Sequence, residues 1–238
     1  MGEPVGPPIV IAHGGMDRSS GFRRTIRHLG TREVLSYDRR GYSGSRDLPV
    51  ATSMADHVDD LVRICAEFDE LPLIVGHSMG GLIALLLLDR PTASTTAAGA
   101  VVWEPPLAWN SWYVSRGEGL LGLDPADAAE SFMRSVIGST LWERLPQRMR
   151  DERRAEGAAL MMDLTGARTP DAVVAFEQIT LPVLVGCGTR SAAHHQRSAH
   201  EAAAEISSAR LVVVEGADHG VHLSDPAAFA ALISSWPG

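Results

Sequence analysis

The sequence has little cysteine and no apolar run long enough to cross a membrane. Cys65 and Cys187 are the 2 cysteines among 238 residues. Each lies in apolar surroundings, so two buried free thiols are expected rather than a disulfide framework. The apolar run from Leu82 to Leu88 is much shorter than the roughly 20 residues that a spanning helix needs, and no basic-then-apolar leader follows Met1. We expect a cytoplasmic protein with no membrane partner.

The chain also lacks a surplus of positive charge. Its net charge is -8, so nucleic acid is not an expected partner. The basic run from Arg144 to Arg154 lies among acidic residues and is typical of a solvated helix face. No phosphate-binding loop and no Cys/His cluster with metal-ligand spacing occurs, so neither a cofactor nor a metal is expected. The side chains of the adjacent pair His194 and His195 are expected to diverge.

The stretch around Ser78 joins an apolar strand to an apolar helix through a glycine-rich turn. Leu73-Ile74-Val75 leads into Gly76-His77-Ser78-Met79-Gly80-Gly81, and the apolar run to Leu88 follows. This context predicts a nucleophile elbow, in which the serine has a strained backbone and the glycines let strand and helix approach closely. Ser78 Oγ would then project from the carboxyl edge of a sheet, beside a helix N-terminus that favours negative charge.

Short apolar strands alternate with helices along most of the chain, which predicts an α/β protein with a parallel sheet covered on both faces. With 238 residues and 45% hydrophobic residues, the chain is long enough to bury a full core. The expected strands are 9–12, 33–37, 73–75, 100–103, 182–186 and 210–214. The expected helices between and after them are 22–29, 53–68, 82–88, 196–206 and 226–236.

One long segment carries no strand pattern. Residues 107–179 hold helical patterns near 125–137, 141–154 and 155–164, and the segment is too long for a loop. We interpret it as a helical cap over the carboxyl edge of the sheet. The predicted organisation is an α/β core of residues 1–106 and 180–238 with the cap inserted between its two parts.

Four motifs in this order resemble those of the α/β-hydrolase fold family. They are His13-Gly14-Gly15, Asp38-Arg39-Arg40-Gly41-x-x-Gly44, Gly76-x-Ser78-x-Gly80-Gly81 and Gly216-x-Asp218-His219-Gly220. The resemblance covers almost the whole chain and implies a Ser/His/acid hydrolase whose cap follows the family's strand six. The family's usual first two strands are missing, which would place the strand at residues 33–37 at a sheet edge. Dimerisation through that edge is a further prediction.

The acid of the implied triad is displaced. The family usually carries an aspartate after strand seven, but the loop Gly186 to Ala193 contains no carboxylate. Glu104 ends the neighbouring strand, and haloalkane dehalogenases and zearalenone-type lactonases keep their acid at that place. Trp103-Glu104-Pro105-Pro106 is similar to the corresponding segment of those lactonases.

The resemblance and the chemistry together assign Ser78 as nucleophile, His219 as base and Glu104 as the acid that orients it. His222 is the reserve base, expected at the surface where the last helix begins. Asp218 adjoins the base, and we interpret it as a loop-capping residue.

An oxyanion requires preorganised N–H donors. Met79, the residue after the nucleophile, and Gly15 are the candidates, and Gly14 stays open as an alternative to Gly15. We expect His13 to brace its loop. We expect Asp38 to brace its turn by accepting backbone donors.

Tryptophan and methionine concentrate in or beside the cap, and Trp109, Trp142 and Met162 are the candidate substrate contacts. An apolar pocket of this kind suits a bulky neutral ester or lactone, so the expected partner is such a small molecule. Two alternatives stay open. One is lyase chemistry of the hydroxynitrile kind, and the other is a non-catalytic small-molecule receptor, which the absent strand-seven acid favours.

Overall fold

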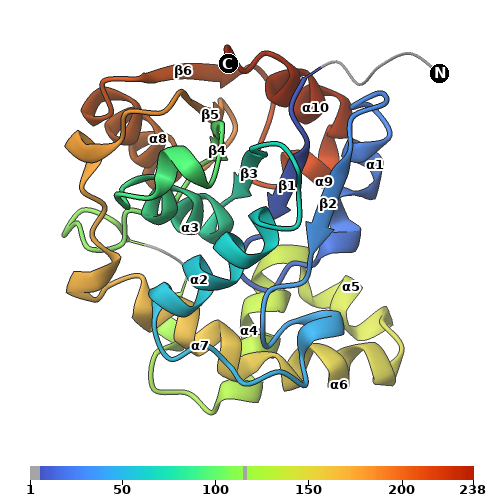
Figure 1. Cartoon of the computed structure of the whole chain (residues 1–238). Coiled ribbons are helices and arrows are strands. Elements are labelled where there is room, and N and C mark those ends of the chain that lie inside the picture. Colours follow the sequence, from blue (N-terminus) through green and yellow to red (C-terminus); the bar gives the residue numbers. More distant parts are fainter. Residues whose placement is uncertain (1–5, 115–116) are drawn as a thin grey trace.

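The computed structural model, which describes residues 6–114 and 117–238, contains one six-stranded sheet in which every neighbouring pair is parallel (Figure 1). The strand order is β2-β1-β3-β4-β5-β6. The strands are β1 (Ile9–Ala12), β2 (Val34–Tyr37), β3 (Leu73–His77), β4 (Gly99–Trp103), β5 (Val183–Gly188) and β6 (Ala209–Val214). The predicted α/β fold with a parallel sheet is confirmed.

The four inner strands are buried along their whole length, as their continuous apolar sequences predict. The edge strands β2 and β6 are partly exposed. The predicted edge position of β2 is confirmed by the strand order. Pairing of two chains through this edge stays a prediction.

Alternate residues of each strand face opposite layers of helices. Val10, Ile74 and Val102 pack with the helices of one face, which are α2 (Met54–Cys65), α3 (Met79–Leu88) and α8 (Ala193–Glu205). Ile11, Val75 and Trp103 pack with the other face, which holds α1 (Arg23–Ile26), α9 (Val221–Ser224) and α10 (Pro226–Ser234). Figure 1 shows α2 and α3 on the near side and α1, α9 and α10 together on the right. Helices therefore cover both faces.

Four helices lie between β4 and β5, and no strand occurs there among the residues that the structure describes. We call α4 (Pro125–Ile137), α5 (Ser139–Arg144), α6 (Gln147–Ala155) and α7 (Gly157–Gly166) the helical insertion. It occupies the lower part of the molecule in Figure 1. The single helix predicted over 141–154 is wrong, because Pro146 forces Leu145 into an extended conformation (ψ 141°) and separates α5 from α6. The exact boundaries of a separate cap domain stay a prediction.

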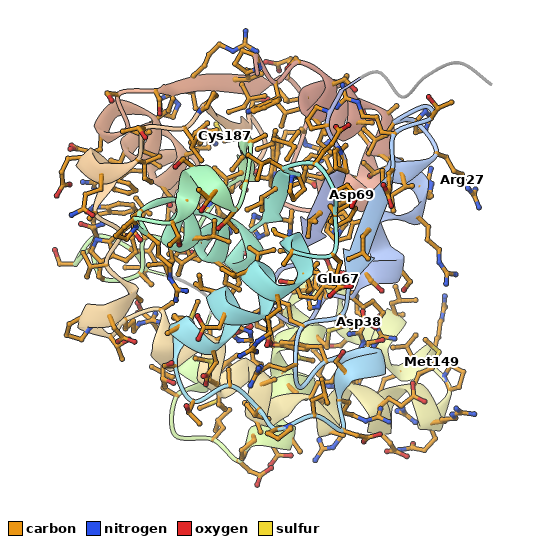
Figure 2. The ribbon with its side chains drawn as sticks, in the orientation of Figure 1. Arg27, Asp38, Glu67, Asp69, Met149 and Cys187 are labelled. Carbon is orange, nitrogen blue, oxygen red and sulfur yellow. The ribbon has the colours of Figure 1, made fainter. Side chains whose placement is uncertain are left out.

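Both cysteines are free and buried, as expected. Figure 2 shows Cys187 within the molecule, whereas Arg27 and Met149 extend from its periphery. Within the described residues, every helix is too short or too polar to span a membrane.

Candidate active site

Ser78 occupies a strained turn between β3 and α3. Its φ of 53° and ψ of -118° are unusual for any residue other than glycine. The crossing of strand and helix is tight around it. A Cβ on Gly76 would lie 2.4 Å from the Gly80 carbonyl oxygen, and one on Gly80 would lie 2.0 Å from that of Ala12. The glycines that the sequence motif supplies are therefore required sterically, and they hold Ser78 at the carboxyl end of the inner strand β3.

The structure brings His219 and Glu104 together. His219 Nδ1 lies 2.6 Å from Glu104 Oε2, across 115 positions of sequence. Glu104 follows β4 and is fully buried, and its second carboxylate oxygen accepts a 2.9 Å hydrogen bond from the Gly188 backbone N–H. The φ of Glu104 is 48°, so a second strained backbone position turns this side chain toward the histidine.

This contact fixes the proton arrangement on His219. Because a carboxylate only accepts, Nδ1 must donate, and a neutral ring then carries its lone pair on Nε2. The His219 side chain is 33% exposed while its partner is 0% exposed. The imidazole is thus held from the buried side by an anion, and its other nitrogen is left available for proton transfer.

Two further histidines contact His219, and no sequence motif indicates either role. His77 Nε2 donates to the His219 carbonyl oxygen at 2.7 Å. The His195 ring stacks on the His219 ring, with centroids 3.9 Å apart and an angle of 9° between planes. The expectation that His194 and His195 diverge is wrong, because their ring centroids lie 4.0 Å apart at the start of α8.

His222 was expected at the surface, and this is also wrong. The residue is 2% exposed, and its ring stacks on Phe22 at 4.5 Å. The short helix α9 turns this side chain inward, beneath the elbow. Asp218 instead accepts from Ser224 Oγ at 3.1 Å, and its carbonyl oxygen accepts from the Val221 N–H. These contacts agree with its predicted capping role.

The loop after β1 carries Gly15, one of the two candidate oxyanion donors, and α3 begins with the other, Met79. The Gly14 carbonyl oxygen accepts from His13 Nδ1 at 2.7 Å and from Arg39 Nη2 at 3.2 Å. In a trans peptide the N–H points opposite to the C=O, so the Gly15 N–H is turned away from Arg39. Met79 is the first residue of α3, and its N–H therefore has no partner within that helix. Gly14 lies close to the Ser78 side chain, because a Cβ on Gly14 would lie 3.1 Å from Ser78 Cβ.

His13 braces this loop from inside. Its Nδ1 donates to the Gly14 carbonyl, so Nε2 accepts, and the Arg39 N–H donates to it at 2.9 Å. Burial, with the Arg39 charge beside it, lowers the pKa of His13 to about 4. The ring is therefore neutral at pH 7 and keeps this donor and acceptor pattern. Asp38 braces the next loop, as predicted, by accepting from the Ser19 and Gly44 backbone N–H groups.

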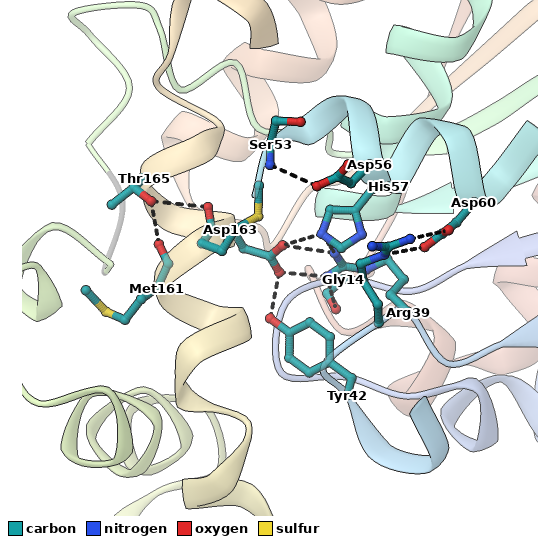
Figure 3. Close-up of polar contacts among 12 residues, drawn as sticks. Gly14, Arg39, Tyr42, Ser53, Asp56, His57, Asp60, Met161, Asp163 and Thr165 are labelled. Carbon is teal, nitrogen blue, oxygen red and sulfur yellow. Dashed lines mark hydrogen bonds and ion pairs between the residues drawn. The ribbon is translucent and has the colours of Figure 1, made fainter. Parts of the chain in front are cut away.

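A buried ion pair connects this loop to the helical insertion. Arg39 donates to both carboxylate oxygens of Asp163 on α7, at 2.9 and 2.7 Å, and Tyr42 OH donates to the same group at 2.7 Å (Figure 3). His57 Nε2 lies 3.5 Å from it. Burial by itself would raise the pKa of Asp163, but the charge and hydrogen bonds of Arg39 outweigh it and hold the pKa well below its usual range. Sequence patterns contain no signal for this pairing, since its partners are 124 positions apart.

Asp163→Ala is expected to destabilise the protein by about 3–5 kcal/mol, because it leaves the buried Arg39 guanidinium unpaired. The native pKa of Asp163 lies below its unfolded value, so its contribution is full at pH 7 and is lost as the pH falls below about 4. Urea unfolding at pH 7 measures the change. The matched control is Asp60→Ala, which breaks the more exposed bidentate pair with Arg40 and should cost no more than about 1 kcal/mol. Equal losses in the two variants would contradict this account.

The three candidate substrate contacts lie in different settings. Trp142 is 1% exposed and packs inside the helical insertion with Met133 and Leu160. Trp109 and Met162 are partly buried and pack against the main core cluster. The ring centroids of Trp109 and Phe176 lie 6.3 Å apart. The position of Trp142 favours a role in the core of the insertion, and the substrate contacts of all three residues stay predictions.

Comparison with known proteins places this geometry in a wider context. The sequence pattern of the alpha/beta hydrolase family matches residues 9–232. No curated protein matches the sequence significantly. Among solved structures, an alpha/beta hydrolase from Sphaerobacter thermophilus is 25% identical, with 95% of this chain and 91% of that chain covered and a TM-score of 0.72.

Two further solved structures have the same fold at lower identity. An enol-lactonase from Burkholderia xenovorans is 20% identical, with 98% of this chain and 92% of that chain covered and a TM-score of 0.73. A thermophilic esterase from Thermogutta terrifontis is 20% identical, with 98% and 89% covered and a TM-score of 0.73. With the parallel sheet and the family match over nearly the whole chain, the protein belongs to the alpha/beta hydrolase family.

Proposed function

We propose that this protein is a serine hydrolase that cleaves a carboxylic ester or lactone of an apolar substrate through an acyl-serine intermediate. The observation that carries the proposal is the 2.6 Å contact between His219 Nδ1 and the fully buried Glu104. A buried carboxylate bound to one nitrogen of a histidine, in a fold whose elbow carries a strained serine, supplies the parts that activate a hydroxyl.

In the proposed mechanism Ser78 Oγ attacks the carbonyl carbon while His219 Nε2 takes its proton. The backbone N–H groups of Met79 and Gly15 donate to the oxygen that becomes negative. His219 then returns the proton to the leaving alcohol, which departs from a cleaved ester or stays attached to the acyl group of an opened lactone. Water attacks the acyl-serine with His219 again acting as base, and Ser78 is regenerated.

Glu104 acts in this scheme without exchanging a proton. Its Oε2 holds the Nδ1–H tautomer of His219 and stabilises the imidazolium that forms when Nε2 takes the proton. The Gly188 N–H donates to its Oε1 and fixes the plane of the carboxylate. An acid after β4 therefore serves where the loop after β5 has no carboxylate.

The substrate class rests on the composition of the segment between β4 and β5 and on the solved structures of the same fold. Trp109 and Met162 supply apolar surface beside the core, which suits a neutral substrate. The enol-lactonase and the esterase of the same fold act on the two bond types proposed here, and at 20% identity they guide the choice of substrates to be tested. The receptor alternative rested on the missing acid after β5, and the Glu104 contact supports an enzyme instead.

Turnover of a panel of p-nitrophenyl esters and γ-lactones of increasing acyl chain length tests the proposal. We expect hydrolysis with a preference for apolar acyl groups, and a pre-steady-state burst of about one p-nitrophenol per chain if deacylation is slower than acylation. A cyanohydrin assayed in parallel tests the lyase alternative, since a lyase would split it into a carbonyl compound and cyanide, whereas hydrolysis of the esters and lactones yields the free acid. Absence of turnover on every ester and lactone would overturn the proposal.

A further inference from the structure

Three polar side chains from different parts of the chain lie close together near Ser78. Asp17 lies in the loop after β1, His77 ends β3 directly before Ser78, and His222 lies in α9. Each offers one ligand atom, and these atoms all lie within 4.8 Å of one another. We call these three residues the lower cluster. No step of the proposed mechanism uses them.

The lower cluster is buried but poorly satisfied. His77 and His222 are 5% and 2% exposed. Among the described residues, His77 Nδ1, both ring nitrogens of His222 and Asp17 Oδ2 have no hydrogen-bond partner. His77 Nε2 donates to the His219 carbonyl oxygen, so the neutral ring carries its lone pair on the unpartnered Nδ1. Buried polar atoms in native proteins nearly always have a hydrogen-bond partner, so this group of buried polar atoms requires an explanation.

The spacing within the lower cluster fits a shared ion. His222 Nε2 lies 3.0 Å from Asp17 Oδ2, which is the distance of an ion pair. Two ligands bound at roughly 2.0–2.1 Å to one tetrahedral ion lie about 3.3 Å apart, close to this separation. The two side chains therefore already stand near the distance that a common metal ion would impose.

Neighbouring residues hold the cluster in place. The Phe22 ring stacks on His222 with 16° between planes and fixes its orientation. A Cβ on Gly21 would lie 2.9 Å from Asp17 Oδ1, so the chain leaves room for the carboxylate there. The Asp17 side chain is 18% exposed, although its Oδ2 atom is buried. The three side chains are therefore held in place before an ion binds.

We propose that Asp17 Oδ2, His77 Nδ1 and His222 Nε2 bind one divalent first-row transition-metal ion such as Zn²⁺. Two imidazole nitrogens and one carboxylate suit Zn²⁺ and its neighbours, whereas Ca²⁺ and Mg²⁺ prefer sites made of oxygen atoms. The bound ion connects the loop that carries Gly15, the residue before Ser78 and the segment after His219. Its role is therefore to stabilise the relative positions of the three catalytic segments.

A second group of possible ligands, Glu104, His195 and His219, provides the internal comparison. Glu104 and His219 already bond to each other at 2.6 Å, and Glu104 also accepts from Gly188. An ion there would have to displace an existing hydrogen bond. We therefore assign the ion to the lower cluster, and the variants below distinguish the two groups.

The test uses the full chain after removal of metal with EDTA and of the chelator by dialysis. ZnCl₂ is added in a calorimetric titration, and thermal unfolding is followed with and without Zn²⁺. We expect one Zn²⁺ per chain and a higher Tm in its presence. Asp17→Asn and His222→Gln should each weaken Zn²⁺ binding at least 10-fold and abolish the rise in Tm. The matched control, His195→Gln, should bind as the parent protein does.

Three results of this test would overturn the proposal. No binding to the parent protein, unchanged binding in both lower-cluster variants, or loss of binding in His195→Gln would overturn the proposal. If both lower-cluster variants fail to fold, anomalous scattering at the zinc edge from crystals grown with ZnCl₂ decides. A peak between Asp17 and His222 supports the site, and its absence there overturns it. None of these measurements depends on ester or lactone hydrolysis, so failure of the metal site and failure of the proposed function are distinguishable.

Discussion

Glu104→Gln is expected to lower kcat on the best ester of the panel by about 10⁴-fold, with a small effect on KM. Glu104 accepts two N–H groups, one from Gly188 and one from His219. Glutamine has one carbonyl oxygen and one NH₂ group. If the oxygen accepts from Gly188, the NH₂ donates to His219 Nδ1 and moves the ring proton to Nε2. His219 in that tautomer cannot accept the Ser78 proton.

Asp218→Asn is the matched control for this prediction. Asp218 is the carboxylate next to the base in sequence, yet its side chain accepts from Ser224 Oγ at the end of the short helix α9. Its kcat should stay within a few-fold of the parent value. Steady-state kinetics on the same ester measure both variants. Survival of turnover in Glu104→Gln together with collapse in Asp218→Asn would assign the acid to Asp218.

Ser78→Ala is expected to lower kcat by about 10⁶-fold, because no covalent intermediate can form. The fold should be retained, since alanine has the same Cβ as serine and removes only the hydroxyl at this turn. Thermal unfolding should therefore give a Tm close to that of the parent protein, while ester hydrolysis falls to the background rate.

Ser43→Ala supplies the control for a serine with comparable backbone strain. Ser43 has a φ of 44°, near the 53° of Ser78, but lies in the loop after β2. Its removal should leave kcat within a few-fold of the parent value. Residual turnover in Ser78→Ala within tenfold of the parent protein would show that another group performs the chemistry.

The fold could be predicted largely because its inner strands are continuously apolar. Strand β1 has the predicted bounds, and β4 differs by one residue. Local sequence patterns did not predict a helix break that a single residue causes. Pro146 splits a helix whose periodicity otherwise runs on, and only the conformation of the preceding Leu145 makes the break evident.

In the candidate site too, some residues could be predicted from sequence motifs and others could not. Ser78 and His219 lie in short sequence motifs that indicate their roles. Glu104 is predicted as the acid because the loop after β5, where the family usually carries it, has no carboxylate. What brings Glu104 to His219 is a positive φ directly after β4, which sequence periodicity does not encode. His195, His222 and the Arg39 pair with Asp163 depend on contacts between distant segments. Such contacts leave no trace in a single sequence, so these residues could be found only in the structure.

The central claim is that Ser78 is a nucleophile activated by a histidine that Glu104 orients. Intact-mass spectrometry after treatment with an aryl fluorophosphonate, followed by peptide mapping, tests it most directly. We predict one phosphonyl group per chain, on Ser78, formed quickly in the parent protein and far more slowly in Glu104→Gln. An unlabelled chain, or a label on any other residue, would contradict the account.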